Sequence, residues 1–223
     1  MRSRGQVRAG ACIALALALA SPAAGAAPLS PDEFAAACRG AEGPSHCARR
    51  IEELQLKRLP NLAARDGDVL KVSLYPTGVV EFKDTITFHG GRTYALWDFM
   101  SEINAVVLFV TNDDNASFVL LQRANGRRYD LPAEPKLSPD RARLATADFC
   151  ASSCENELAV WRVTKDTVQK ELVWKPPRPW SDAGVTWKSA ETLVIEYTAA
   201  DAKGEATLER RLSDPGWQRA DAP

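Results

Sequence analysis

The chain has 223 residues, of which 45% are apolar and 26% are charged, close to the averages for globular proteins. These values argue against a disordered, collagen-like or coiled-coil chain, and the length allows one large domain or two small ones. The formal net charge is −1 and no block of five like charges occurs, which argues against a nucleic-acid binder that works by neutralising phosphates.

Residues 1–26 have the pattern of a signal peptide. Three arginines precede the apolar run 11–20, which is too short for the ~20 residues that span a bilayer as a helix. Ala24-Gly25-Ala26 then matches the small-x-small cleavage pattern, and 18–20 offers an earlier competitor. We expect a mature chain that begins at Ala27, carries a net charge of −4 after the loss of three arginines, and is periplasmic or secreted in a bacterium.

Four cysteines remain in the expected mature chain: Cys38, Cys47, Cys150 and Cys154. An even number of cysteines in an exported chain predicts disulfides. Three pairings are possible, and we favour the two local ones, Cys38 to Cys47 and Cys150 to Cys154. A four-cysteine zinc site is the alternative, but the nine- and four-residue steps do not repeat a paired ligand motif.

Residues 27–62 are predicted to form a helical hairpin. Ser30-Pro31-Asp32-Glu33 is a capping box with proline at the first helical position, so a helix should run to about Arg39 and end at Gly40. Ser45 can cap a second helix through about Arg58. A bridge from Cys38 to Cys47 would then join the end of the first helix to the start of the second.

Residues 63–223 are predicted to form an antiparallel β domain. Short β-branched and aromatic runs alternate with turn residues, and Asn125-Gly126 is the strongest hairpin signal because both residues accept the positive φ of a type I′ turn. The run 105–110 has no polar face and therefore belongs to a strand covered on both sides. The predicted strands are 69–74, 79–82, 93–97, 105–110, 117–122, 127–131, 143–147, 157–163, 168–173, 192–197 and 206–212.

Part of this domain resembles the repeats of TolB-like and WD40-like β-propellers. Ser138-Pro139-Asp140 followed by 143–148 is similar to their Ser-Pro-Asp-Gly turn and strand, and 157–163 is similar to the next blade strand. Weaker copies begin at Ser189 and Ser101, while Arg141 replaces the usual glycine. The resemblance implies meander sheets arranged as incomplete propeller blades, because a closed propeller needs at least about four blades. A β-sandwich is the alternative.

Motifs for common catalytic mechanisms are missing from the sequence. His46 is interpreted as an exposed helix residue, and His89-Gly90-Gly91 lacks the Gly-x-Ser-x-Gly elbow that an esterase would need. Four carboxylates are considered as members of a hydrolytic pair, although each has an ordinary interpretation in a turn or at a strand end: Asp113, Asp114, Asp148 and Glu155. We predict no cofactor and no metal.

The most distinctive polar and aromatic segment runs from Trp174 to Trp180, with Trp187 shortly after it. Its three prolines predict a stiff extended connection, and its tryptophans lie close in sequence to Lys175 and Arg178. Tryptophan and arginine are frequent interface hot spots, so these five residues are the candidate contact surface for a ligand or partner. The alternative is that the tryptophans cover the open end of the sheet core.

The sequence predicts an exported protein that works by binding another exported protein or a glycan, with no nucleic-acid partner and no membrane span. This prediction depends on the expected export, the disulfides and the absence of catalytic motifs. A hydrolase that uses Asp or Glu on an envelope glycan is the second hypothesis, and a deep cleft with two convergent carboxylates would favour it. A structural envelope domain without a specific ligand is the third.

Overall fold

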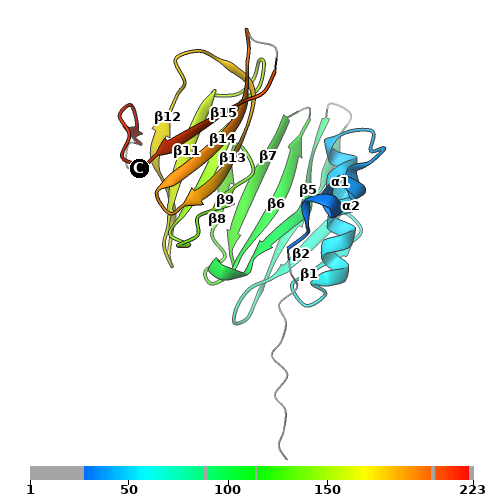
Figure 1. Ribbon diagram of the computed structural model, residues 1–223. Coiled ribbons are helices and arrows are strands. Elements are labelled where there is room, and N and C mark those ends of the chain that lie inside the picture. The colour runs from blue at the N-terminus through cyan, green and yellow to red at the C-terminus, as the bar shows by residue number, and fades with distance from the viewer. Residues whose placement is uncertain (1–27, 88–89, 114, 202–203, 221–223) are drawn as a thin grey trace, which may run out of the picture.

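A computed structural model describes residues 28–87, 90–113, 115–201 and 204–220 (Figure 1). The predicted signal peptide and the new terminus at Ala27 lie outside the described residues. In the described part of the chain, two helices precede four antiparallel sheets, which confirms the prediction of a mainly β protein with a helical hairpin at its start.

The helical hairpin consists of α1 (Pro31–Cys38) and α2 (Pro44–Arg58). The predicted capping box is present, since Ser30 Oγ accepts a hydrogen bond from Glu33 N and the Glu33 carboxylate accepts one from Ser30 N. The prediction that Ser45 caps the second helix is wrong. The residue at the cap position is Gly43, which has no side chain that could accept a hydrogen bond from the helix. Pro44 follows it and supplies the preset φ of the first helical turn.

Both predicted disulfides are formed. Cys38 is bonded to Cys47 across the hairpin, with 4.6 Å between their Cα atoms, and Cys150 is bonded to Cys154, with 5.5 Å between theirs. Two disulfides indicate an oxidising environment outside the cytoplasm. No helix in the described ranges combines the length and apolarity needed to cross a bilayer.

Each sheet is built mainly from strands that follow one another in the chain and pair antiparallel. The first sheet contains β1 (Ala63–Asp66), β2 (Val69–Ser73) and β3 (Val79–Lys83). The second contains β4 (Thr85–Thr87), β5 (Gly90–Met100), β6 (Ala105–Asn112), β7 (Asn115–Gln122) and β8 (Arg128–Leu131), with the short 3-10 helix η1 (Ser101–Ile103) after β5. The third contains β9 (Lys136–Leu137), β10 (Arg143–Asp148), β11 (Glu157–Val163), β12 (Val168–Trp174) and the returning β16 (Gln218–Arg219), and the fourth contains β13 (Trp180–Ser189), β14 (Thr192–Ala199) and β15 (Ala206–Arg211).

The four sheets stack in series, with an apolar layer between each pair of neighbours. One layer joins the first sheet to the second, another joins the second to the third, and the last joins the third to the fourth. Strand β6 supplies alternate residues to both faces of the second sheet, Val106 and Leu108 to one and Val107 and Phe109 to the other. This arrangement confirms the prediction of a strand covered on both sides, and the described sheets form an open stack rather than a closed ring (Figure 1).

Several strands escaped prediction because their sequences are short or polar. These are β1, β4, β9, β13 and β16, and β13 begins at Trp180, the last residue of the segment expected to be a stiff connection. The β7–β8 hairpin predicted from Asn125-Gly126 is present, but only Gly126 has positive φ. The turn is therefore wider than a two-residue type I′ turn, and Asn125 contributes its Oδ1, which accepts a hydrogen bond from Arg127 N.

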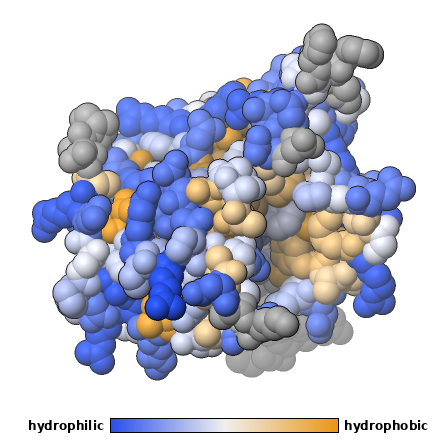
Figure 2. All heavy atoms as spheres, turned by 90° about the horizontal axis from the view of Figure 1, so that it is seen from above, coloured by the Kyte–Doolittle hydropathy of each residue, from blue (hydrophilic) through white to orange (hydrophobic). Residues whose placement is uncertain are grey.

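The exposed surface is largely hydrophilic. Seen from above, polar side chains dominate, with smaller hydrophobic areas between them (Figure 2). In the described part of the chain, Tyr75 and Val79 are large apolar side chains that are well exposed, at 64% and 58%. They lie at the turn between β2 and β3, and isolated residues of this kind need no binding partner to explain them.

Candidate functional site

The edge of β5 that faces the helical hairpin is covered by side chains instead of a strand. Among the described strands, β4 pairs with β5 only as far as Arg92. Beyond that point Asp84 accepts a hydrogen bond from Tyr94 N, and Glu52 accepts one from Leu96 N. Gln55 Nε2 donates to the Trp97 carbonyl at 2.8 Å. Helix α2 therefore fixes the position of β5 next to the point where the strand bulges.

The bulge lies at Trp97 and changes the direction of the strand. Leu96 pairs with Leu108 but Asp98 pairs with Val107, so Trp97 is the additional residue. Bulges re-aim side chains and are frequent beside functional sites. Here the Trp97 ring packs against Phe34 of α1, with 5.3 Å between ring centroids, and Asp98 is left at the wall of a recess.

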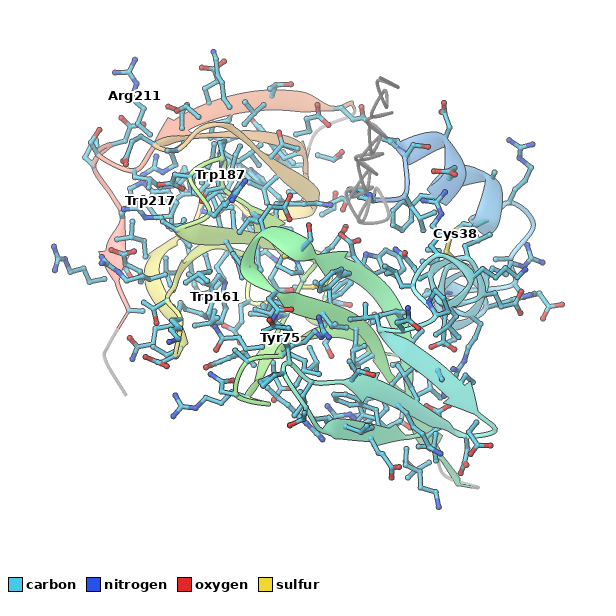
Figure 3. The ribbon with its side chains drawn as sticks, turned by 90° about the horizontal axis from the view of Figure 1, so that it is seen from below. Cys38, Tyr75, Trp161, Trp187, Arg211 and Trp217 are labelled. Carbon is cyan, nitrogen blue, oxygen red and sulfur yellow. A yellow bond between two sulfur atoms is a disulfide. The ribbon has the colours of Figure 1, made fainter. Side chains whose placement is uncertain are left out.

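Two adjoining recesses meet at Asp98, Glu134 and Lys136, and we call them together the Asp98 groove. Their volumes are about 430 and 390 Å³, within the range of small-molecule sites. Figure 3 shows Trp187 among the strands of the fourth sheet and the helical hairpin, marked by Cys38, across the molecule from it. The groove is lined by Pro28, Leu29, Pro31, Phe34, Trp97, Asp98, Phe99, Met100, Glu102, Glu134, Pro135, Lys136, Leu137, Pro139, Thr186 and Trp187.

Asp98 is a partly buried carboxylate with few partners. It accepts one hydrogen bond from a described residue, from Phe99 N at 2.8 Å, and it has no described ion pair. Removal from water raises the pKa of Asp98 above its ordinary value of 3.8. The Phe99 hydrogen bond and the charge of Lys136 act in the opposite direction, while the charges of Glu134 and Glu102 add to the increase.

Glu134 and Lys136 form the polar ridge between the two recesses. Lys136 Nζ lies 2.7 Å from Glu134 Oε1, and the same oxygen accepts a hydrogen bond from Trp97 Nε1 at 3.1 Å. The Lys136 carbonyl in turn accepts a hydrogen bond from Trp187 Nε1 at 2.8 Å. This chain of contacts ties the segment before β9 to the second sheet on one side and the fourth sheet on the other.

Of the five residues predicted as a contact surface, only Trp187 lines the groove. Trp174 and Trp180 are 8% and 5% exposed and belong to the apolar layer between the third and fourth sheets. Trp180 stacks on Tyr197 with 4.0 Å between ring centroids. The ring faces of both tryptophans are therefore buried against other side chains. This is what the alternative interpretation predicts, in which the tryptophans cover the sheet core.

The two cations of that segment lie at the surface. Lys175 Nζ is 3.4 Å from Glu155 Oε2, and Arg178 Nη1 is 3.4 Å from Asp201 Oδ2. Arg178 is exposed and its ion pair is open to solvent, so the pair contributes little to stability. Neither cation lines the Asp98 groove.

Three of the four carboxylates considered as a hydrolytic pair lie in the described part of the chain, and none of these three lines the groove: Asp113, Asp148 and Glu155. Asp113 has a φ of 55° and its Oδ1 accepts a hydrogen bond from Gly91 N, as expected of a turn residue. Asp148 accepts a hydrogen bond from Glu155 N beside the second disulfide. Asp114 and His89 lie outside the described residues, and His46 is an exposed helix residue whose Nε2 accepts a hydrogen bond from Arg50 Nε at 3.1 Å.

Other recesses occur at the described surface. One, of about 390 Å³, includes Glu102 together with Arg141 and Lys165 near the end of η1. A smaller one, of about 140 Å³, lies on the outer face of the fourth sheet beside Asp182 and Glu196. Within the described ranges, no group of three or more His, Cys, Asp or Glu side chains is placed to hold a metal ion.

The sequence alone did not identify Asp98, Glu102, Glu134 or Lys136. They come from β5, from η1, from the segment before β9 and from β9 itself, and only the stacking of the second sheet between its neighbours brings them to one groove. The sole local signal was Trp97-Asp98, a charged residue after an aromatic one near the end of a strand. Comparisons with protein-family models, with curated proteins and with solved structures give no match.

Proposed function

We propose that this is an exported, non-catalytic binding protein and that its ligand is a glycan held in the Asp98 groove. The observation that carries the proposal is the groove itself, in which aromatic and proline surfaces surround three carboxylates and one lysine. Sugars present apolar ring faces together with hydroxyl groups. Aromatic rings can pack against those faces, while Asp98 and Glu134 can accept hydrogen bonds from the hydroxyls and Lys136 can donate to them.

The shape of the site favours a glycan over a protein partner. Two recesses of about 390 and 430 Å³ are sized for a few sugar units, whereas a stable protein interface needs roughly 800 Å² of surface from each partner. The two disulfides and the predicted signal peptide support the export part of the proposal, because both belong to an oxidising compartment outside the cytoplasm.

A titration with defined glycans tests the proposal. The mature protein would be titrated with soluble fragments of envelope glycans and with neutral chito-oligosaccharides, and binding would be followed by calorimetry and by tryptophan fluorescence. Glu134→Gln should weaken binding about tenfold or more, because it removes a charge-assisted acceptor worth roughly 1.5 to 3 kcal/mol. Asp182→Asn, on the outer face of the fourth sheet, is the matched control and should bind as the wild type does. Failure of every glycan in the panel to bind, or equal binding by Glu134→Gln, would refute the proposal.

A glycan hydrolase is the second candidate, and a specific feature of Asp98 favours it. A carboxyl whose pKa is raised by burial, beside a second carboxylate that is paired with lysine, is the arrangement from which general acids are made. The same titration distinguishes the two functions if the release of reducing ends is also measured. A hydrolase would release them and lose at least about a hundredfold in rate in Asp98→Asn while still binding the glycan. Binding without release supports the non-catalytic function.

A further inference from the structure

The recess that contains Arg141 and Lys165 lies where turns of the second and third sheets meet, and we call it the Arg141 recess. Its volume is about 390 Å³, within the range of small-molecule sites. It is lined by η1, by the end of β7 and the turn after it, by the turn between β9 and β10, and by the turn between β11 and β12. It shares Glu102 with the Asp98 groove.

Hydrogen bonds between these segments fix the walls of the recess. Gln122 Nε2, at the end of β7, donates to the Thr164 carbonyl in the β11–β12 turn at 2.9 Å. Arg123 Nη1 donates to Asn104 Oδ1 at 2.8 Å, which holds the residue that follows η1. A ligand therefore meets walls that are already ordered, so little conformational entropy is lost when it binds.

Arg141 has a backbone conformation that favours glycine. Its φ is 63°, in the left-handed region that residues with a Cβ atom adopt at a cost. The turn itself is closed by other groups, since Arg141 N donates to the Ser138 carbonyl and Ser138 Oγ bonds to Asp140 Oδ1. All of these bonds would also form with glycine at position 141. An arginine kept in a strained position that does not need its side chain suggests that the side chain has a function.

The two cations of the recess have no partners in the described part of the chain. Arg141 and Lys165 are exposed, and neither side chain forms an ion pair or hydrogen bond with a described residue. Arg143, two positions further on, differs because it lies within 3.9 Å of three carboxylates. Glu102 is the one acidic residue that lines the recess. Two positive charges and one negative charge leave an excess of one positive charge, which suits a ligand with a single negative charge.

We propose that the Arg141 recess binds the carboxylate of a sugar acid. The planar guanidinium of Arg141 can hold a carboxylate through two parallel hydrogen bonds, and Lys165 supplies the second cation. The wall also presents the Ser101 hydroxyl, the Asn104 amide and the apolar Ile103 side chain, which suit a ring that carries hydroxyl groups. The sugar acid is either a free molecule or a unit of an acidic glycan chain. Since the two cations lie outside the Asp98 groove, the inference does not rest on the glycan proposed for that groove.

A titration followed by NMR tests the proposal with matched probes. The ¹⁵N-labelled mature protein is titrated with D-galacturonate and with D-galactose, which has the same ring without the charge. Galacturonate should shift the backbone amide signals around the recess, and added salt should weaken its binding. Tetragalacturonate separates the two sources, because tighter binding of the tetramer indicates a chain and equal binding indicates a free acid. Galactose binding as well as galacturonate at these amides, or no binding there by either acidic probe, would overturn the proposal.

The variant Arg141→Gly separates binding from folding. The Kd for galacturonate should rise about tenfold or more, because a charge-assisted hydrogen bond is lost. The melting temperature should stay close to that of the wild type, because relief of the left-handed strain offsets the greater freedom of glycine in the unfolded chain. Lys165→Gln should also weaken binding, whereas Arg178→Gln, which changes an exposed arginine outside the recess, should not.

Two outcomes for Arg141→Gly would overturn the inference. A clear fall in melting temperature would show that the arginine is needed for the fold. Unchanged galacturonate binding by the folded variant would show that the guanidinium does not hold the carboxylate. Neither result bears on neutral glycans in the Asp98 groove, whose test uses other variants.

Discussion

The substitution Glu52→Ala tests whether the polar cluster on α2 is what covers the exposed edge of β5. Glu52 is 3% exposed, and its carboxylate accepts hydrogen bonds from Leu96 N at 2.9 Å and from Arg65 Nη2 at 2.7 Å. Arg65 and Arg49 both also contact Asp84, so one carboxylate from the helix and one from the segment before β4 share two arginines. Removing Glu52 leaves the β5 amide of Leu96 without its acceptor. The two partly buried guanidinium groups then keep one carboxylate partner, Asp84, in place of two.

The expected cost is large for a single surface-helix position. Breaking a buried ion pair by removing one partner typically costs about 3 to 5 kcal/mol, because the remaining charge stays desolvated. For a chain of this size, each kcal/mol corresponds to roughly 2 to 4 °C in melting temperature, so a decrease of roughly 6 to 20 °C is expected. Glu52→Gln should cost less, because the amide oxygen still accepts the hydrogen bond from Leu96 N.

Glu53→Ala is the matched control, since Glu53 is the next residue of the same helix and is exposed. An exposed substitution of this kind usually changes stability by less than about 0.5 kcal/mol. Urea unfolding and thermal unfolding, both followed by circular dichroism, would be compared for the two variants. If Glu52→Ala and Glu53→Ala unfold at the same midpoint, the cluster is not what holds the helical hairpin to β5.

Three further predictions follow from the described contacts. Replacing Cys38 and Cys47 together by serine should lower the free energy of unfolding by about 2 to 3 kcal/mol, because the closed loop is short, and denaturant unfolding of the oxidised wild type beside the variant measures this. Trp180→Ala should cost about 3 to 5 kcal/mol as a core truncation, whereas Arg178→Ala should lie within about 0.5 kcal/mol of the wild type; equal effects would contradict the burial of the tryptophan. The folded state holds the Asp98 proton more tightly than the unfolded state, so the stability of the wild type should fall relative to Asp98→Asn as pH rises above about 4. Unfolding at a series of pH values would show no such difference if the pKa is not raised.

Much of the fold could be predicted because its signals are local. The capping box at Ser30 depends on residues three positions apart, and the wholly apolar run 105–110 can only be satisfied by a strand with a layer on each face. The two disulfides join cysteines nine and four residues apart, which a short chain segment can bring together without information on the rest of the fold. These features can be predicted from the sequence because the interactions that stabilise them depend on residues close together in the chain.

The candidate site could not be predicted because its parts are polar residues on separate elements. Asp98 faces the groove only because Trp97 is an additional residue in β5, and the sequence gives no sign of that register shift. Glu134 lies in the segment before β9 and Lys136 is the first residue of that two-residue strand, and their position depends on contacts to Trp97 and to Trp187. In the Trp174–Trp180 segment, composition and burial point to different roles. A tryptophan beside proline and arginine has the composition of an interface, but Trp180 begins a strand that closes the last apolar layer.

The groove and the stability of the hairpin depend on the same short stretch of β5. Glu52 holds Leu96 N and Gln55 holds the Trp97 carbonyl, so both act on the residues immediately before Asp98. The Trp97 ring then contacts Phe34 of α1, whose first turn follows directly from the buried Leu29 and from Pro28 in the groove wall. A change that loosens α2 from β5 should therefore displace Asp98 and the start of α1 together. Glu52→Ala is expected to weaken glycan binding even under conditions where the protein remains folded, and Glu53→Ala is not. Unchanged glycan affinity in folded Glu52→Ala would show that the hairpin stabilises the fold without positioning the groove.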